Sequence, residues 1–333
     1  MKTIAFFNNK GGVGKTSLVY HLAWMFRETD RRVMAIDLDP QANLSGMFLD
    51  ERRLAELWQG LEKKTIDGDI APLFEGTGDI ASAPHVEEID DRLGLLVGDL
   101  NLARREGDLS EQWSKCLDQD KRAFRVTTAF ARLIADAGKA FQAELALLDV
   151  GPNLGAINRA ALVASDYVVI PLAPDLFSLQ GLGNTGPTLR SWKGGWRDRV
   201  KRKPPELTIT LPKGNMKPLG YIVMRHSARL DRPVKAYLRW IEKIPVEYRT
   251  SVLQENSLVA PALDTDEHLL AHLKDYRSLM PMAQEANKPM FMLKPADGVI
   301  GAQQQAARSC YDDFRTLSEK IIRKMNEETS SAS

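Results

Sequence analysis

Residues 10–17 read Lys-Gly-Gly-Val-Gly-Lys-Thr-Ser and directly follow a short apolar run at residues 4–7. Leu18, Leu22 and Phe26 come next at helical spacing, so the glycines lie between a predicted strand and a predicted helix. Glycine lets the backbone curl and point its N–H groups at a phosphate, and the start of a helix adds partial positive charge there. The stretch therefore predicts a phosphate-binding loop in its usual strand–loop–helix setting.

The residue types of this loop predict what each would contact. Lys15 would reach the β- and γ-phosphates of a nucleotide, and the Thr16 hydroxyl would ligate Mg²⁺. The general phosphate-loop pattern calls for glycine where Asn9 stands, and an additional lysine, Lys10, opens the loop. We assign nucleotide binding to Gly11, Gly12, Val13, Gly14, Lys15, Thr16 and Ser17.

Two further apolar runs end in aspartates. One continues as Asp37-Leu38-Asp39-Pro40-Gln41, and the other ends at Asp149. Carboxylates at the carboxyl ends of parallel strands face the ligand crevice of an open α/β sheet. Taken alone, Asp37 and Asp39 fit a helix-capping turn better than a metal site, and many strands end in aspartate. With the phosphate loop upstream, a magnesium–nucleotide site becomes the better interpretation.

Strand-like and helix-like segments alternate along the chain. Strands are predicted at 3–7, 33–38, 93–97, 145–150, 167–171, 218–224 and 290–293, and helices at 16–28, 124–141, 155–164, 232–243 and 303–325. The pattern predicts an α/β fold with a mostly parallel, twisted sheet and helices on both faces. We expect one domain over residues 1–325, with an acidic helical subregion at 50–120, a basic excursion at 190–217 and a disordered tail at 326–333.

The charges of the 333 residues nearly cancel, with a net charge of +1, but they are unevenly distributed. Residues 50–120 hold 18 acidic and 8 basic side chains, whereas residues 190–243 hold 15 basic and 4 acidic ones. The two cysteines have no disulfide or metal-site spacing, and no apolar run is long enough to span a membrane. These features predict a cytoplasmic protein without a membrane partner.

In content, order and spacing, these motifs resemble the ParA/MinD family of P-loop ATPases. The family has a deviant phosphate loop with an added signature lysine, matched by Lys10, then a D-x-D-P-Q switch, a Walker B aspartate and a strand that ends in proline. The resemblance covers residues 1 to about 185. It departs at Gly151, where the family usually has proline. We also expect no N-terminal helix-turn-helix extension of the kind that the larger partition ATPases carry.

The resemblance implies ATP and Mg²⁺ as cofactors and a homodimer that forms on ATP binding. By this resemblance Lys15 binds the phosphates, Asp39 activates the attacking water, and Lys10 reaches the other subunit's phosphates. Magnesium would be held by Thr16, Asp37 and Asp149. By position only, the adenine contacts are expected at Pro174, Asp175, Met224 and Arg225.

Family members mostly bind DNA without sequence preference, and this chain has a matching cationic stretch. A basic stripe on the predicted helix at 232–243 and the cations before it would bind phosphates by counterion release. A solvated cationic face remains the alternative. The candidate DNA contacts are Arg190, Lys193, Arg197, Arg199, Arg229, Arg232, Lys235 and Arg239.

The function expected from these features is a ParA-like ATPase that segregates DNA or positions a cargo, helped by an unidentified cargo or ATPase-activating protein. The alternative is a nucleotide-switched regulator with slow hydrolysis and little or no DNA binding. Residues 310–324 carry mixed charges, so a closing helix packed on the sheet is favoured over a membrane-binding helix. His268 and His272 could form a metal pair, but a simple amphipathic helix explains them better.

Overall fold

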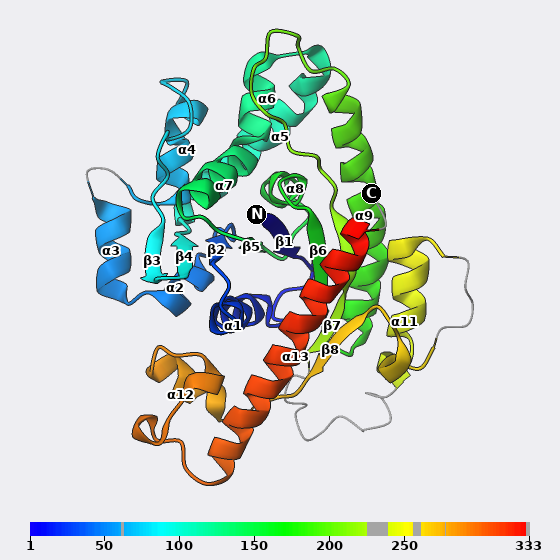
Figure 1. Cartoon of the computed structure of the whole chain (residues 1–333). Coiled ribbons are helices and arrows are strands. Elements are labelled where there is room, and N and C mark those ends of the chain that lie inside the picture. Colours follow the sequence, from blue (N-terminus) through cyan, green and yellow to red (C-terminus); the bar gives the residue numbers. More distant parts are fainter. Residues whose placement is uncertain (61–62, 225–238, 256–260, 277, 331–333) are drawn as a thin grey trace.

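The computed structural model describes residues 1–60, 63–224, 239–255, 261–276 and 278–330 (Figure 1). Within this part, eight strands form one sheet in the order β3-β4-β2-β5-β1-β6-β7-β8. All neighbouring strands are parallel except β3 and β4, which are antiparallel. The strands are β1 (Lys2–Phe6), β2 (Val33–Asp37), β3 (Glu87–Asp90), β4 (Leu93–Leu96), β5 (Leu145–Asp149), β6 (Tyr167–Leu172), β7 (Lys217–Met224) and β8 (Leu269–Leu273).

Helices cover both faces of the sheet, as the near-continuous apolar strands require. One face packs against α4 (Ile66–Glu75), α5 (Glu106–Lys115), α6 (Lys121–Thr127), α7 (Ala129–Ala140), α8 (Ala156–Val163), α9 (Leu176–Val200) and α11 (Ile244–Glu247). The other packs against α1 (Lys15–Glu28), α2 (Asn43–Phe48), α3 (Glu51–Gln59), α12 (Leu279–Glu285) and α13 (Ala302–Ser330). Short turns complete the chain: η1 (Leu100–Arg105), η2 (Cys116–Asp118), η3 (Tyr248–Leu253), η4 (Leu263–Thr265), η5 (Met290–Met292) and η6 (Pro295–Asp297).

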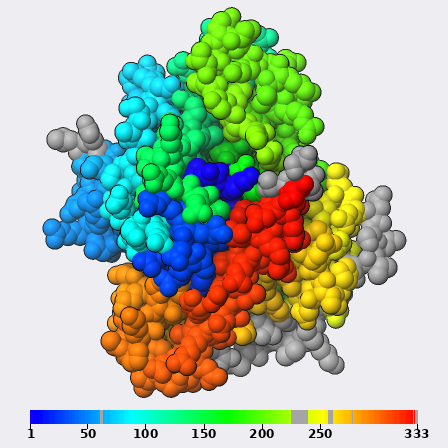
Figure 2. Space-filling view, in the orientation of Figure 1, coloured from blue at the N-terminus to red at the C-terminus, as the bar shows by residue number. Residues whose placement is uncertain are grey.

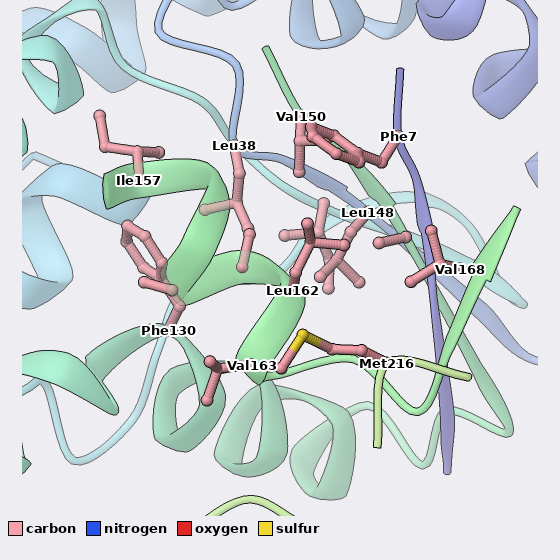
Figure 3. Packing of buried hydrophobic residues seen from close by; sticks show 14 of the residues in the cluster. Phe7, Leu38, Phe130, Leu148, Val150, Ile157, Leu162, Val163, Val168 and Met216 are labelled. Carbon is pink, nitrogen blue, oxygen red and sulfur yellow. The ribbon is translucent and has the colours of Figure 1, made fainter. Parts of the chain in front are cut away.

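Side-chain alternation along the central strand divides the core into two layers. Ala5 and Phe7 point into the layer beneath α8 and α9, whereas Ile4 and Phe6 point into the layer beneath α1 and α13. Figure 3 shows the first layer, where Leu148 and Val168 from the sheet lie near Leu162 of α8. Both layers are fully buried, so the sheet is a rigid platform for the loops at its carboxyl edge.

The predicted strands are confirmed except the last. The run at 290–293 forms the turn η5, and its Met290 N–H donates to Nε2 of His21 at 3.1 Å instead of to a neighbouring strand. The eighth strand is β8, which lies where the sequence suggested an amphipathic helix around His268 and His272. His272 lies in β8 and His268 directly precedes the strand; four residues of extended chain would separate their Cα atoms by about 13 Å, too far for a shared metal.

The predicted helices at 16–28, 155–164 and 303–325 are confirmed as α1, α8 and α13. The one at 124–141 is split into α6 and α7 at Thr128, whose hydroxyl donates to the carbonyl of Phe124 at 2.7 Å. Helix α13 buries Phe314, Leu317 and Ile321 against the sheet and runs beside α1 (Figure 2), so the closing-helix interpretation is confirmed.

Helix α13 continues to Ser330, so the disordered tail predicted from 326 is wrong up to that residue; residues 331–333 lie outside the described part. The predicted helix at 232–243 lies outside it up to 238. Helical structure is described at residues 239–241.

The basic excursion at 190–217 begins inside a long helix. Helix α9 runs through to Val200, and the chain then returns along it, with Trp196 Nε1 donating to the carbonyl of Pro212 at 2.9 Å. Gly214 has φ +60°, and a Cβ there would lie 2.2 Å from Cδ1 of Trp196. Burial of Leu182, Leu189, Trp192 and Trp196 outweighs the poor helix propensity of the glycines and Pro187 in α9.

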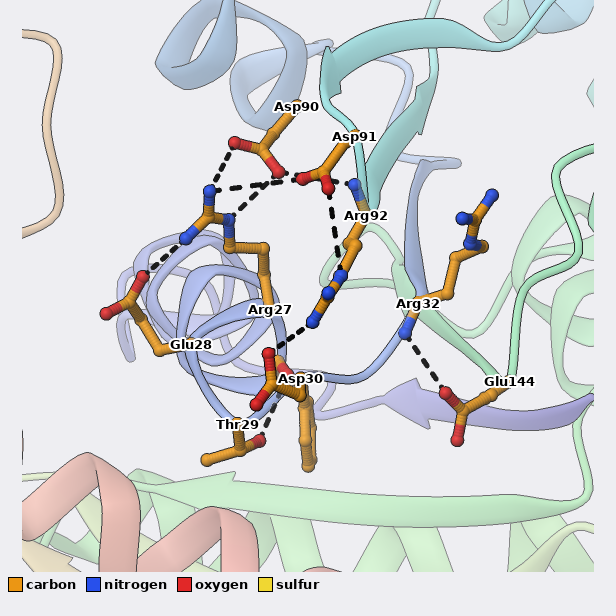
Figure 4. A network of polar contacts seen from close by, with 10 residues as sticks. Arg27, Glu28, Thr29, Asp30, Arg32, Asp90, Asp91, Arg92 and Glu144 are labelled. Carbon is orange, nitrogen blue, oxygen red and sulfur yellow. Dashed lines mark hydrogen bonds and ion pairs between the residues drawn. The ribbon is translucent and has the colours of Figure 1, made fainter.

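The acidic subregion at 50–120 contains β3 and β4 and is therefore not wholly helical. Many of its carboxylates pair with arginines of the same chain. Arg27 donates to both oxygens of Asp90 at 2.9 and 2.6 Å (Figure 4), and Arg53, Arg105 and Arg132 pair with Glu87, Asp67 and Asp79. The contacts around Asp90 lie at the amino-terminal edge of the sheet, away from the phosphate loop.

Candidate functional site

The phosphate loop joins β1 to α1 at the carboxyl edge of the sheet. Gly12 and Gly14 have φ +70° and +85°, the left-handed region that glycine adopts without strain. Gly14 is the N-cap of α1, and no side chain bonds to the first turn there. The free N–H groups of that turn can therefore bind an anion.

Lys15 opens α1 and is largely buried, with 7% of its surface exposed. Burial lowers the pKa of its ammonium, while the nearby carboxylates of Asp149 and Asp39 act in the opposite direction. The ammonium of Lys15 therefore lies between the phosphate loop and the carboxylates of Asp39, after β2, and Asp149, at the end of β5.

Asp37 and Asp149 are register partners at the ends of β2 and β5, and both are fully buried. The Ser45 N–H and hydroxyl donate to Oδ2 of Asp37 at 2.8 Å each. Within the described residues, Oδ1 of Asp37 and both oxygens of Asp149 have no hydrogen-bond partner. Burial raises the pKa of Asp37 to about 8 and that of Asp149 to about 7, because charged carboxylates are poorly solvated there.

These unpartnered oxygens fit a divalent cation. Leaving buried carboxylate oxygens without a partner costs free energy, and a hard cation would supply the missing interaction. No cluster of three or more His, Cys, Asp or Glu in the described chain could hold a metal by itself. Mg²⁺ usually takes one or two carboxylates together with water and substrate phosphates, and Asp37 and Asp149 supply two carboxylates here.

Asp39 lies two residues beyond β2 and is 7% exposed. Its Oδ1 accepts the Gln41 N–H at 3.0 Å. The loop after Asp149 passes beside it, since a Cβ on Gly151 would lie 3.5 Å from this oxygen. The same loop approaches the phosphate loop, where a Cβ on Gly11 would lie 3.7 Å from Pro152.

Lys10 forms an ion pair with Asp175 of its own chain and lies 5.8 Å from the ring centroid of Phe177. Asp175 is also the N-cap of α9, because its Oδ1 accepts the Ser178 N–H at 2.9 Å. Burial raises the pKa of Asp175, but the bonds from Lys10 and Ser178 outweigh it and hold that pKa below its usual range. Pro174 and Asp175 thus lie beside the phosphate loop.

Of the other residues expected near adenine, Met224 is half-buried at the end of β7. Arg225 lies outside the described residues.

The predicted DNA contacts on α9 do not form one exposed stripe. Arg199 is buried: its guanidinium lies 3.9 Å from the ring centroid of Trp113 and donates to the carbonyls of Trp113 and Gly195 at 2.6 and 2.8 Å. Arg190 donates to the carbonyl of Ser251 at 2.6 Å and so ties α9 to η3. Burial of Arg199 contradicts its prediction as a surface cation, whereas Arg190 is half-buried.

Lys193 is half-buried, whereas Arg197 and Arg239 are exposed. Arg229, Arg232 and Lys235 lie outside the described part of the chain.

Several residues that support the site were not predicted. Asn8 donates to the carbonyl of Pro171 at 2.7 Å and accepts the Lys10 N–H at 3.0 Å, which fixes the entry of the phosphate loop. Asn158 and Glu106 hold the loop after Asp149. Asn158 carried one signal, a polar residue at an apolar position of a predicted helix. Glu106 carried none, because its partners lie 50 residues away.

His21 ties α1 to the carboxyl-terminal layer and was also not predicted. It is fully buried, its Nδ1 donates to the Ser17 carbonyl at 2.7 Å, and its Nε2 accepts the Met290 N–H. These two bonds require the neutral ring with hydrogen on Nδ1. Burial lowers the pKa of His21 to about 4.

Comparison with known proteins agrees with this geometry. The AAA_31 family, described as an AAA domain, matches residues 1–200. IncC of Escherichia coli is 35% identical over 182 residues, which are 55% of this chain and 44% of IncC. The chromosome partitioning protein ParA of Myxococcus xanthus is 28% identical over 216 residues, 65% of this chain and 67% of ParA. The chain thus spans between about two fifths and two thirds of these curated relatives.

The ATP complex of McdA from Cyanothece superposes with a TM-score of 0.63 over 98% of this chain and 96% of McdA. At 14% identity this likeness shows the fold alone. No described helix is long and apolar enough to cross a membrane. The family match over residues 1–200, the parallel sheet and the phosphate loop beside its aspartates lead to one conclusion: the chain belongs to the ParA-like P-loop ATPases of the ParA/MinD family.

Proposed function

We propose that residues 1–325 form one Mg²⁺-dependent ATPase domain that dimerises on ATP, binds DNA without sequence preference and segregates DNA or positions a cargo. The observation that carries the proposal is the phosphate loop beside two buried aspartates with three unpartnered oxygens. The name of the Myxococcus relative, a chromosome partitioning protein, supports the direction of this proposal. A cytoplasmic, nucleoid-associated location is part of it.

In the proposed reaction the loop N–H groups and Lys15 bind the phosphates, as the free first turn of α1 allows. Thr16, Asp37 and Asp149 would hold Mg²⁺, which when bound offsets the negative charge of the phosphates. Asp39 orients the attacking water and accepts its proton. Lys10 leaves Asp175 to stabilise charge on the phosphates of the second subunit.

The proposed DNA surface uses the exposed cations at the end of α9 and in the segment after it. Those in the described chain are Arg197, Lys201, Arg202, Lys203 and Lys213. The internal contacts of Arg190 and Arg199 reduce this surface, which favours a second candidate: a nucleotide-switched regulator that controls a partner protein with little DNA binding.

A titration of labelled duplex DNA, followed by fluorescence anisotropy, separates the two candidates. It is run with ATP–Mg²⁺, ADP–Mg²⁺ and no nucleotide, at about 50 and 200 mM salt. ATP-specific binding that weakens with salt is the expected result, and Lys15→Ala should abolish it together with binding of a fluorescent ATP analogue. Tight ATP binding without DNA binding in any state would reject the DNA role and favour the regulator.

A further inference from the structure

We propose that Glu106 of α5 is a positioning residue for the loop after Asp149, residues 150–155, which we name the switch loop. Glu106 lies outside every motif that carries the nucleotide chemistry. Its carboxylate holds the start of α8, and through α8 it fixes the loop that passes beside Asp39. The kinetic part of this inference rests on the proposed ATPase function.

Both carboxylate oxygens of Glu106 cap the first turn of α8. One oxygen of Glu106 accepts the Ala156 N–H, and the other accepts the Ile157 N–H at 3.0 Å. The N-cap of α8 is Gly155, which has no side chain, and the first turn of α8 contains no acid. A carboxylate from another helix therefore satisfies N–H groups that would otherwise lack partners, and it interacts favourably with the helix dipole.

Gly155 is the residue that admits this carboxylate. A Cβ at position 155 would lie 2.5 Å from Oε1 of Glu106, closer than any real contact allows. The φ of Gly155 is −82°, a value open to every residue, so backbone strain gives no reason for glycine here. The close approach of Glu106 gives one reason, and Oδ1 of Asn153, which would lie 2.8 Å from the same Cβ, gives a second.

Helix α5 contacts α8 at a second point, through Trp113, which lies two turns after Glu106 along α5. The guanidinium of Arg159 lies 4.5 Å from the ring centroid of Trp113, and its Nη2 donates to the Leu109 carbonyl at 3.4 Å. On its other side α8 is anchored in the core by Ile157, which lies close to Phe130 in Figure 3. The start of α8 is thus fixed relative to α5 and the sheet.

From α8 the restraint passes to the reacting groups. The Asn158 amide donates to the carbonyls of Gly151 and Asn153 at 2.8 and 2.7 Å, which closes the switch loop onto the helix. Gly151 borders Asp39 and Pro152 borders Gly11, as described above. A displacement of the α8 terminus would therefore shift the loop between the proposed water-orienting carboxylate and the phosphate loop.

The experiment compares Glu106→Ala, Glu106→Gln and Gly155→Ala with wild type. ATP affinity should stay within about twofold, because the phosphate loop is untouched. The kcat for hydrolysis should fall about tenfold in Glu106→Ala, since small misplacements of reacting groups reduce rates strongly. Glu106→Gln keeps one acceptor and should lose about threefold. Gly155→Ala should lose at least as much, because its Cβ would displace both an intact Glu106 and the side chain of Asn153. Glu111→Gln, on the same helix and exposed, is the matched control and should change nothing.

Hydrogen exchange of residues 150–158 gives a second readout, independent of turnover. Faster exchange there in Glu106→Ala and Gly155→Ala, but not in Glu111→Gln, is expected. Unchanged exchange and kcat in both variants would overturn the proposal, as would parallel losses of ATP affinity and kcat. If wild type binds ATP but does not hydrolyse it, the ATPase proposal fails, and the exchange measurement alone decides whether Glu106 positions the loop.

Discussion

Lowering the pH from 7.5 to 5 should reduce the free energy of unfolding by about 2 kcal/mol through one side chain, His21. The folded-state pKa is about 4 against an ordinary value of 6.5. Above pH 6.5 the ring is neutral in both states and the contribution is fully present. As the pH falls, the unfolded chain takes up the proton first, so stability is lost between about pH 6.5 and 4. At pH 5 the linkage relation gives a loss of about 2 kcal/mol, approaching about 3.4 kcal/mol below pH 4.

The assay is urea unfolding at several pH values for wild type and His21→Gln. Other groups titrate in this range too, so the quantity to compare is the difference between the two pH profiles. The wild-type profile should be steeper by about 2 kcal/mol between pH 7.5 and 5. His85→Gln is the matched control, because it replaces a histidine that is only half-buried and whose Nε2 lies 2.9 Å from Glu87. Parallel profiles for wild type and His21→Gln would refute the reasoning.

Three further predictions follow from the site and its surroundings. Asp149→Asn should raise the thermal midpoint of the nucleotide-free protein by a few degrees in calorimetry, because it removes a poorly solvated buried carboxylate. It should also reduce the Mg²⁺ dependence of ATP binding, measured by titration with and without Mg²⁺. An unchanged Mg²⁺ dependence would exclude Asp149 from the metal site. Gly214→Ala should reduce the free energy of unfolding in urea by about 1–3 kcal/mol, because alanine would have to adopt φ +60° and its Cβ would collide with Trp196. An unchanged free energy of unfolding would contradict the packing of the segment around Gly214 against α9. Replacing Arg197 and Lys203 together by Glu should weaken ATP-dependent DNA binding at least tenfold in anisotropy titrations, whereas Arg52→Glu, at an exposed position of α3, should not. Equal effects of the two changes would contradict a defined surface at the end of α9.

The parts of the fold that could be predicted are those with strong local signals. The first six predicted strands are buried on both faces, so each is a continuous apolar run. The same rule failed at residues 290–293, where an apolar run is buried beneath α13 without pairing to a strand. Strand β8 was missed because His272 interrupts its apolar pattern. Helix α9 was missed because its glycines and Pro187 resemble a loop, although five large apolar residues bury its inner face.

The site residues, too, could be predicted only where a local sequence motif contains them. Lys15, Thr16, Asp39 and Asp149 could be proposed because fixed motifs carry them. The partners that position these groups come from distant parts of the chain and follow no spacing rule. Ser45 bonds to Asp37 because α2 folds back over the end of β2, and Arg199 is buried because Trp113 of a separate helix lies beneath it. Counting cations along the sequence could not distinguish Arg199 from the exposed Arg197.

The two margins of the sheet have a consequence for how copies of this chain can meet. Strand β3, at one margin, has only four residues, and its exposed side chain is Glu88, so two copies joined there would bring like charges together. At the other margin, α13 reaches β8, where Lys320 donates to the carbonyl of Leu269. Strand-to-strand joining of two molecules is thus disfavoured on both sides. The proposed pairing on ATP would then use the loops around Lys10, where Leu154, Leu176 and Phe177 are exposed.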